Sequence, residues 1–347
     1  MPSMSRIVTL HHSLCTGFQF WRAENSASIS YVPGSPDGAS HTACAPHPRA
    51  KRSGGDTGLP DMTLEMARDA GAQTLVIGVV NAGGVLPDHW VSVIVEAIAM
   101  GYDVASGLHR PLQEIPAIRE AAEAHGRNLF NVRLAETRFA TGRGTKRPGK
   151  RLLTVGTDCS IGKKYTALAI EREMRGRGFD AEFRATGQTG ILISGRGVSI
   201  DAVVADFISG AAEWISPASD ENHWDIVEGQ GSLYHPSFAG VSLGLLHGSQ
   251  PDAYIVCHEP TRTHMRNVET PMPTIRQVME LTEICGKLTN PDIRCVGVAI
   301  NTAALDEESA RRVIEETAAE IGQPTTDPVR FGIAHIVDNI ASIYGAP

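Results

Sequence analysis

The feature that most constrains the fold is a strand–loop–helix pattern at residues 152–166, LLTVGTDCSIGKKYT. An apolar stretch typical of a buried strand runs into a glycine-bounded loop, and a helical pattern begins at Gly162 and Lys163. This order gathers backbone N–H groups, the positive end of a helix dipole and a lysine around one point. The segment therefore predicts a parallel α/β sheet with a phosphate-binding loop at the carboxyl end of one strand. An ordinary strand–turn–helix connection is the alternative.

The residue after the loop lysine indicates how phosphate charge is neutralised. The spacing is G-x5-G-K, whereas nucleotide hydrolases have G-x4-G-K followed by Ser or Thr, which holds Mg²⁺. Here Lys164 stands at that position. We therefore expect lysines to hold the phosphates without hydrolysis and with no metal required. The candidate cofactor-binding residues are Gly156, Thr157, Asp158, Cys159, Ser160, Ile161, Gly162, Lys163, Lys164, Tyr165 and Thr166.

Alternating strand and helix patterns predict two doubly wound α/β domains. We place the first at 59–137 and the second at 151–347, joined by a basic, breaker-rich linker at 138–150. Residues 1–58 show no sustained period and are expected to form an irregular or atypical N-terminal segment. Expected strands cover 74–80, 102–105, 129–132, 151–155, 181–185, 224–227, 253–257 and 295–300. Expected helices cover 63–70, 88–100, 112–125, 163–177, 200–214, 274–285 and 307–321.

Composition excludes several classes of protein. The 347 residues include 31 Lys and Arg against 39 Asp and Glu, a formal net charge of −8, which argues against a nucleic-acid partner. No apolar run approaches the ~18 residues of a membrane helix, so we expect no membrane partner. The 6 cysteines include no C-x-x-C pair and no zinc spacing, and the chain does not open on a signal-peptide pattern. A reduced, cytoplasmic protein is expected.

Polar side chains follow other expected strands at the same edge of the predicted sheet. Glu228 ends one strand, and it and His235 are candidate bases, with capping of its own loop as the alternative for Glu228. Pro260 disfavours a metal site in the loop that carries Arg262 and Arg266, and these arginines are available for anions. The candidate catalytic residues are Glu228, His235, Lys164 and Asp158. The candidate substrate-binding residues are Arg184, Thr186, Gln188, Gln230, Ser232, Arg262 and Asn81.

Five segments carry a family resemblance: GLPDM at 58–62, NAGG at 81–84, GTDCSIGKKYT at 156–166, TGQTG at 186–190 and EGQGS at 228–232. Together they resemble the D-glutamate N-acetyltransferase family. The resemblance implies a Rossmann-like N-terminal domain and a C-terminal domain like that of P-loop NTPases. It also implies acetyl transfer from acetyl-CoA to the amine of D-glutamate, in D-amino acid metabolism, by a cytoplasmic homo-oligomer. Family members open with an apolar strand and helix, which the first 54 residues do not show.

Acetyl transfer to an amine needs three kinds of groups. A base must deprotonate the α-ammonium of glutamate, and we assign this role to Glu228 or His235. Donors must stabilise the developing oxyanion, which we assign to Lys164 or the loop amides. Cations must bind the two substrate carboxylates, which we assign to Arg184 and Arg262.

Two other functions fit part of the pattern. The loop also resembles the GTDTxxGKT loop of dethiobiotin synthetase, which implies a Mg-ATP-dependent ligase or kinase. Lys164 counts against this alternative because the hydroxyl that holds Mg²⁺ is missing. A nucleotide sensor without catalysis is the second alternative, and the polar loops at several strand ends count against it.

Overall fold

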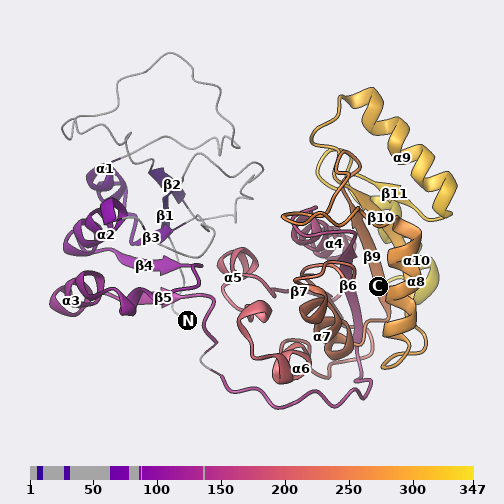
Figure 1. Ribbon diagram of the computed structural model, residues 1–347, viewed down its shortest axis with the longest axis horizontal. Helices are drawn as coiled ribbons and strands as arrows, with labels where there is room; N and C mark the ends of the chain where they lie inside the picture. The colour runs from indigo at the N-terminus through magenta and orange to yellow at the C-terminus, as the bar shows by residue number, and fades with distance from the viewer. Residues whose placement is uncertain (1–5, 11–26, 32–62, 78–85, 87, 136) are drawn as a thin grey trace. The chain divides into compact units, whose positions relative to one another are not determined.

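The computed structural model of the chain forms two compact units, residues 1–134 and 135–347, which we describe in turn (Figure 1). The structure describes residues 6–10, 27–31, 63–77, 86, 88–135 and 137–347. The candidate substrate-binding residue Asn81 and the segments at 58–62 and 81–84 lie outside the described residues.

The first unit contains a five-stranded sheet in the order β2-β1-β3-β4-β5, and every strand pair in it is parallel. Its strands are β1 (Arg6–Leu10), β2 (Ala27–Tyr31), β3 (Thr74–Ile77), β4 (Asp103–Ser106) and β5 (Leu129–Asn131). Its described helices are α1 (Leu64–Asp69), α2 (Asp88–Ala99) and α3 (Pro116–His125), with a 3₁₀ turn at Leu112–Glu114. The predicted parallel α/β architecture is confirmed for this unit.

Two strands in the N-terminal segment belong to the first sheet. We expected 1–58 to form an irregular or atypical segment; its described residues are strands, and β1 lies between β2 and β3, with Val8 in register with Leu75 of β3. A strand of five residues is too short to show a clear period of 2, and its hydrogen-bonding partner β3 lies far along the chain. Pairing across the sheet therefore decides its structure, and local sequence does not.

Helices α2 and α3 form the core of the first unit against the sheet. Trp90, Ile94 and Ile98 follow one another at four-residue spacing along α2 and are buried, as is Ile118 of α3. The buried Tyr102 hydroxyl donates to the carbonyl oxygen of Leu64 at 2.6 Å and so ties α1 to the start of β4.

The second unit contains a six-stranded parallel sheet in the order β11-β10-β9-β6-β8-β7. Its strands are β6 (Lys150–Gly156), β7 (Ala181–Arg184), β8 (Trp224–Val227), β9 (Ala253–His258), β10 (Arg294–Ile300) and β11 (Thr325–Thr326). Its helices are α4 (Lys163–Gly176), α5 (Gln188–Ser194), α6 (Ile208–Ile215), α7 (Ala239–Ser249), α8 (Ile275–Gly286), α9 (Glu307–Ile321) and α10 (Ala334–Tyr344). All five strands that we predicted here are confirmed, to within two residues at each end.

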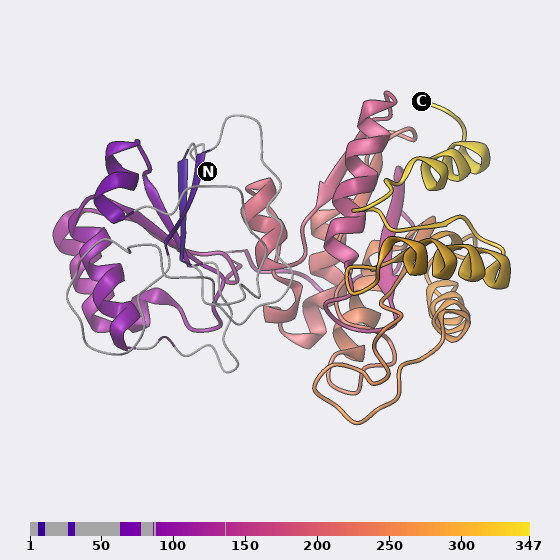
Figure 2. The same cartoon turned by 90° about the horizontal axis from the view of Figure 1, so that it is seen from above.

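Helices cover both faces of this second sheet (Figures 1 and 2). Helices α4 and α10 pack against each other on one face, and α6, α7 and α8 lie on the other. This division follows from right-handed crossovers, because β6 connects to β7 in one direction along the sheet, whereas β7–β8, β8–β9 and β9–β10 run in the opposite direction. The doubly wound arrangement that the sequence predicts is therefore confirmed.

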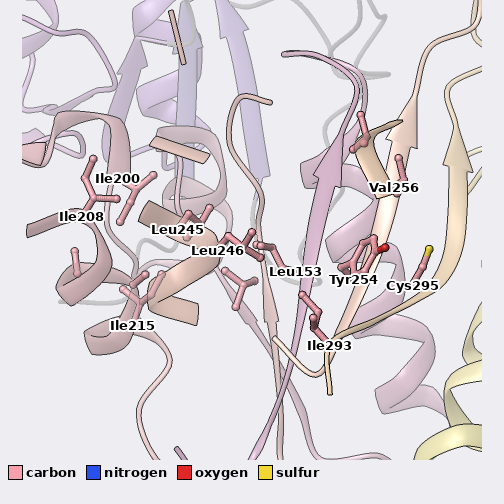
Figure 3. Close-up of a cluster of buried hydrophobic side chains, with 14 of the residues drawn as sticks. Leu153, Ile200, Ile208, Ile215, Leu245, Leu246, Tyr254, Val256, Ile293 and Cys295 are labelled. Atoms are coloured by element: carbon pink, nitrogen blue, oxygen red, sulfur yellow. The ribbon is translucent and has the colours of Figure 1, made fainter. Parts of the chain in front are cut away.

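The main core of the second unit lies between the sheet and helices α6 and α7. Leu153 of β6 and Tyr254 of β9 face Ile208 of α6 and Leu245 and Leu246 of α7. Figure 3 shows these side chains gathered between helices and strands. All of them are buried, so this core fixes β6, the strand that leads into the phosphate-binding loop.

The predicted helix over 200–214 is wrong in its first half. The structure has 3₁₀ turns at Ile200–Ala202 and Ala205–Phe207, and only then α6. Val203 and Val204, which lie between the two turns, have extended ψ angles of 137°. Adjacent β-branched residues favour extended backbone, so they interrupt the helix here.

The stretch that we predicted as a linker is hydrogen-bonded to the second unit. The backbone N–H groups of Arg143 and Gly144 donate to Glu213 Oε1 at 2.8 and 3.1 Å. The fully buried guanidinium of Arg151 donates to carbonyl oxygens of Arg147, Pro148, Gly149, Ser216 and Pro217.

Candidate active site at the phosphate-binding loop

The candidate site lies at the carboxyl edge of the second sheet. Because all six strands are parallel, the loops that follow β6, β7, β8 and β9 leave from the same edge. These loops carry most of the residues that we singled out from the sequence. A small internal cavity of about 20 Å³ lies beneath the loop after β8, lined by Gly229, Gln230 and Ser232 and by core side chains such as Leu245 and Leu246.

The loop after β6 has the backbone of a phosphate cradle. Ser160 and Gly162 have positive φ angles of 54° and 111°, and α4 begins directly afterwards at Lys163. The first N–H groups of a helix have no partner within it, so they are directed toward the loop. Gly156 is closely packed, because a Cβ there would lie 2.6 Å from Ile161 Cδ1 and 3.0 Å from the carbonyl oxygen of Cys257. Lys163 Nζ donates to the carbonyl oxygen of Asp158 at 2.6 Å.

The half-buried Lys164 and the buried Glu228 influence each other's pKa through their opposite charges. Burial lowers the pKa of Lys164 to about 8, and the charge of Glu228 partly offsets this effect. Burial raises the pKa of Glu228 to about 7, against the opposing effects of Lys164 and of two backbone amides. A lysine whose pKa is lowered to about 8 and a carboxyl whose pKa is raised to about 7 suit a donor and a base that act together near neutral pH.

Glu228 is held in place by the loop after β7. Its Oε2 accepts from the backbone N–H groups of Thr186 and Gly187 at 3.0 and 3.1 Å, and Thr186 Oγ1 donates to the Glu228 carbonyl oxygen at 2.6 Å. Gln230 Nε2 donates to Thr186 Oγ1 at 3.1 Å. A Cβ at Gly190 would lie 2.3 Å from Oε2, so the glycines of TGQTG leave room for this carboxylate. Glu228 therefore caps the N–H groups of the loop after β7, which was the alternative role, and its pKa is raised as well.

Gly229 offers a test of this packing. A Cβ there would lie 1.5 Å from the carbonyl oxygen of Thr154, whose hydroxyl accepts from the Gly229 N–H at 2.9 Å. We expect Gly229→Ala to lower the free energy of unfolding by about 3 kcal/mol or more, as measured by urea denaturation. Gly176→Ala is the matched control, since a Cβ at Gly176 meets nothing within 4 Å. Equal stability of the two variants would contradict the close packing described here.

His235 is fixed as a neutral donor. Its Nε2 lies 3.0 Å from the carbonyl oxygen of Arg266, and its Nδ1 lies 3.1 Å from the backbone nitrogen of Ser237. A carbonyl oxygen can only accept and a backbone N–H can only donate, so Nε2 carries the proton and Nδ1 accepts. The lone pair of this histidine is therefore already in use. This geometry favours Glu228 over His235 as the base.

Asp158, Cys159 and His235 place possible metal-ligand atoms within 4.8 Å of one another. Asp158 Oδ1 is buried without a hydrogen-bond partner among the described residues, which favours such a site by ligand type. Against it, both ring nitrogens of His235 already have partners, and a metal at Nε2 would displace the contact with Arg266. Burial raises the pKa of the Cys159 thiol, which opposes formation of the thiolate that metals prefer.

The two arginines that we assigned to substrate carboxylates have different surroundings. Arg184 folds back along the sheet, where its Nε lies 2.6 Å from Asp225 Oδ1 and its Nη2 lies 2.8 Å from Glu182 Oε2. Its charge is neutralised there, so we no longer place it in the site. Arg262 stays at the loop, donating to Asp158 Oδ2 at 2.6 Å and to the Cys159 carbonyl oxygen at 2.9 Å.

Two further predicted residues, Gln188 and Ser232, follow β7 and β8. Gln188 is the first residue of α5, and the buried Ser232 accepts from the Tyr234 N–H at 3.2 Å. His258 is a further residue at this edge, with no role predicted from the sequence: its Nδ1 lies 3.0 Å from Thr157 Oγ1, and burial lowers its pKa. Its position at the end of β9, the strand next to β6, was the available signal.

The fold and the site define a class of protein. A parallel sheet with a phosphate-binding loop after a central strand, and a buried carboxylate at the end of the adjacent strand, is typical of P-loop α/β domains. The chain belongs to the family described as DUF1611, a domain of unknown function. The model of its P-loop domain matches residues 138–337, and that of its Rossmann-like N-terminal domain matches residues 49–135.

Two named relatives and one solved structure are similar to this chain over most of its length. The chain is 52% identical over 285 residues to a protein of Pseudoalteromonas sp. named D-glutamate N-acetyltransferase, covering 82% of this chain and 86% of that protein. It is 48% identical over 328 residues to a protein of the same name from Tritonibacter scottomollicae, covering 94% and 93%. The crystal structure of a DUF1611 family protein from Anabaena variabilis matches with a TM-score of 0.84 and 32% identity, covering 97% of this chain and 99% of that one. Within the described residues, no helix is both long and apolar enough to cross a membrane.

Proposed function

We propose that this protein transfers the acetyl group of acetyl-CoA to the amine of D-glutamate, giving N-acetyl-D-glutamate and CoA. Relatives at about 50% identity over most of the chain carry the name D-glutamate N-acetyltransferase. The structural observation that carries the proposal is the pair of Lys164 and Glu228. The half-buried Lys164 follows the loop lysine where nucleotide hydrolases have a Mg²⁺-binding hydroxyl, and the buried carboxyl of Glu228, whose pKa burial raises to about 7, feels its charge.

The phosphate-binding loop suits the donor substrate. Coenzyme A carries a pyrophosphate and a separate phosphate that must be bound without being cleaved. The N-terminus of α4 offers N–H groups and a positive partial charge to such a group, and Lys163 and Lys164 add two cations. Lysines supply positive charge without activating a water for attack on phosphorus, so this donor set fits binding better than hydrolysis.

The reaction begins with removal of a proton. The α-ammonium of D-glutamate gives one proton to the carboxylate of Glu228, which passes it to solvent after the reaction. The free amine then attacks the thioester carbonyl carbon and forms a carbon–nitrogen bond. The resulting oxyanion is stabilised by the Lys164 ammonium or by N–H groups of the loop.

Collapse of this intermediate completes the transfer. The carbon–sulfur bond breaks, CoA leaves as the thiolate, and the second proton lost from nitrogen goes to that sulfur. Arg262 lies at the edge of the loop and is more exposed than Arg184, but it is likewise paired with two carboxylates, those of Asp158 and Glu259. A substrate carboxylate that binds Arg262 must therefore displace one of these partners. A base with a pKa near 7 is efficient here because a useful fraction is unprotonated at neutral pH.

The resemblance also implies a homo-oligomer in the cytoplasm, and we keep both as part of the proposal. The four described cysteines, Cys159, Cys257, Cys285 and Cys295, are free thiols, as expected in a reducing compartment. Light scattering of the purified protein at two concentrations tests the oligomeric state. A monomer at both would contradict it.

A thiol-release assay tests the reaction. Purified protein is incubated with acetyl-CoA and D-glutamate, L-glutamate or no acceptor, with EDTA or with Mg²⁺. We expect CoA release that requires D-glutamate and is unaffected by EDTA. ATP consumption that requires Mg²⁺, without thiol release, would instead support the ligase or kinase alternative.

A further inference from the structure

A short hairpin after β9 lies against the phosphate-binding loop. This segment, residues 259–272, which we call the strap, is closed by hydrogen bonds from the Met265 N–H to the Thr270 carbonyl oxygen and from the Met272 N–H to the Thr263 carbonyl oxygen, both 2.9 Å. His264 and Pro271 form an antiparallel bridge within it. The buried side chain of Met265 anchors the strap, so its backbone has a defined path.

Two buried polar side chains hold the peptide groups of one residue in the strap. The backbone N–H of Arg266 donates to Asp158 Oδ2 at 2.7 Å, and His235 Nε2 donates to the Arg266 carbonyl oxygen at 3.0 Å. Asp158 is 0% exposed and His235 is 1% exposed. Burying a carboxylate and an imidazole costs free energy, so contacts that fix one exposed residue call for an explanation.

The side chain of Arg266 differs from those of its neighbours. Arg266 is exposed, and its guanidinium has no partner among the described residues, whereas Arg262 is paired with Asp158 and Glu259. The guanidinium of Arg266 lies close enough to the phosphate-binding loop to influence the pKa of Cys159. Burial raises the pKa of Cys159, and the charges of Lys163, Arg266 and Arg262 act in the opposite direction.

We propose that Arg266 is a second anion-binding residue of this site, taking an anionic oxygen group of a substrate that the phosphate-binding loop does not itself hold. Asp158 and His235 are then its positioning residues. The inference rests on the proposed function, whose substrates supply two such groups. One is the phosphate of coenzyme A outside the pyrophosphate, and the other is a carboxylate of glutamate. A guanidinium binds either one through two parallel hydrogen bonds.

Arg266→Ala tests the residue directly. The Kd of CoA and of dephospho-CoA is measured by calorimetry, and the KM of D-glutamate by thiol release. If the phosphate is the ligand, the affinity for CoA falls by about tenfold or more and that for dephospho-CoA does not change. If a carboxylate is the ligand, the KM of D-glutamate rises by a similar factor while the Kd of CoA does not change. Arg294→Ala, an exposed arginine at the opposite end of the sheet, is the matched control for charge.

The remaining outcomes separate the two proposals. Unchanged CoA affinity and unchanged KM of D-glutamate in Arg266→Ala would overturn the inference and leave the proposed function standing. A wild-type protein that binds no CoA and releases none from acetyl-CoA would overturn the proposed function, and the inference with it. The loss in Arg266→Ala should also shrink as salt is raised, because an exposed cation acts through a screened charge.

The positioning role has a separate test. We expect His235→Ala to weaken binding of the same ligand as Arg266→Ala does, with kcat changed much less than the binding constant. His235→Gln should restore binding, because its amide can again donate to the Arg266 carbonyl oxygen. The double variant should bind no more weakly than Arg266→Ala alone. Additive losses, or failure of the glutamine variant to restore binding, would overturn the positioning role.

Discussion

Replacing Glu228 by glutamine should lower kcat by about 10²- to 10⁴-fold, with little change in the KM of D-glutamate. The variant keeps the shape of the side chain and an oxygen that can accept from the N–H groups of Thr186 and Gly187. It removes the proton acceptor whose pKa of about 7 matches neutral pH. Thiol release at saturating substrates measures the effect, and Glu316→Gln on the exposed face of α9 is the matched control.

The pH profile provides a second measurement on the same variant. A base is active when deprotonated, so the rate of the wild-type enzyme should rise as pH increases through about 7. This rise should be absent from Glu228→Gln, which retains only the dependence due to the substrate ammonium. The variant should also stay folded. Because burial raises the pKa of Glu228, ionised Glu228 destabilises the folded wild type above its unfolded pKa, and glutamine removes that effect. A variant with more than a tenth of the wild-type kcat would exclude Glu228 as the base.

Replacing Lys164 by methionine should lower kcat/KM by about 10²- to 10³-fold, the loss typical of removing one donor to an oxyanion. Methionine resembles the half-buried lysine stem in length but carries no charge. The same change should raise the pKa of Glu228, since Lys164 is the largest factor that lowers it. The rise of rate with pH should therefore move to a pH above 7.

The control for this variant is Lys287→Met, at an exposed lysine just after α8. It removes one positive charge from the same unit without touching the loop. An unchanged pH profile in Lys164→Met would contradict the coupling between Lys164 and Glu228. A loss of activity without a shift of the profile would leave Lys164 as a phosphate ligand only.

The parts of the fold that sequence predicted are those with a strong local signal. The apolar strands of the second unit and the amphipathic α4 and α9 were recognised because their period is visible within one element. Helix α7 was missed because it contains Gly240, Gly244 and Gly248, which disfavour a helix when read locally. The structure gives the reason, because a Cβ at Gly244 would lie 2.5 Å from Ile208 of α6. These glycines allow two helices to approach, and that is a tertiary requirement.

Tertiary contacts in the candidate site were likewise not predictable from local sequence. The loop residues and Glu228 could be placed at one edge because parallel strands end together. The partner of Arg184 could not be predicted, because Asp225 becomes its neighbour only when β7 and β8 pair with Glu182 opposite Asp225. The tautomer of His235 likewise depends on Arg266, which is far away in sequence. A sequence therefore predicts which residues gather at an edge, but not which of them are already bonded to one another.

The distances along the chain between bonded site residues have a consequence for folding. The contact between Arg262 and Asp158 joins residues 104 positions apart, and that between Arg266 and Asp158 joins residues 108 positions apart. Such contacts form only after β6 has paired with β9, and pairing of distant strands is a slow step because long loops must close. The site is thus assembled with the sheet and not ahead of it. A substrate bound across the loop and the strap selects molecules in which that pairing is complete, so it raises the melting temperature of the whole second unit.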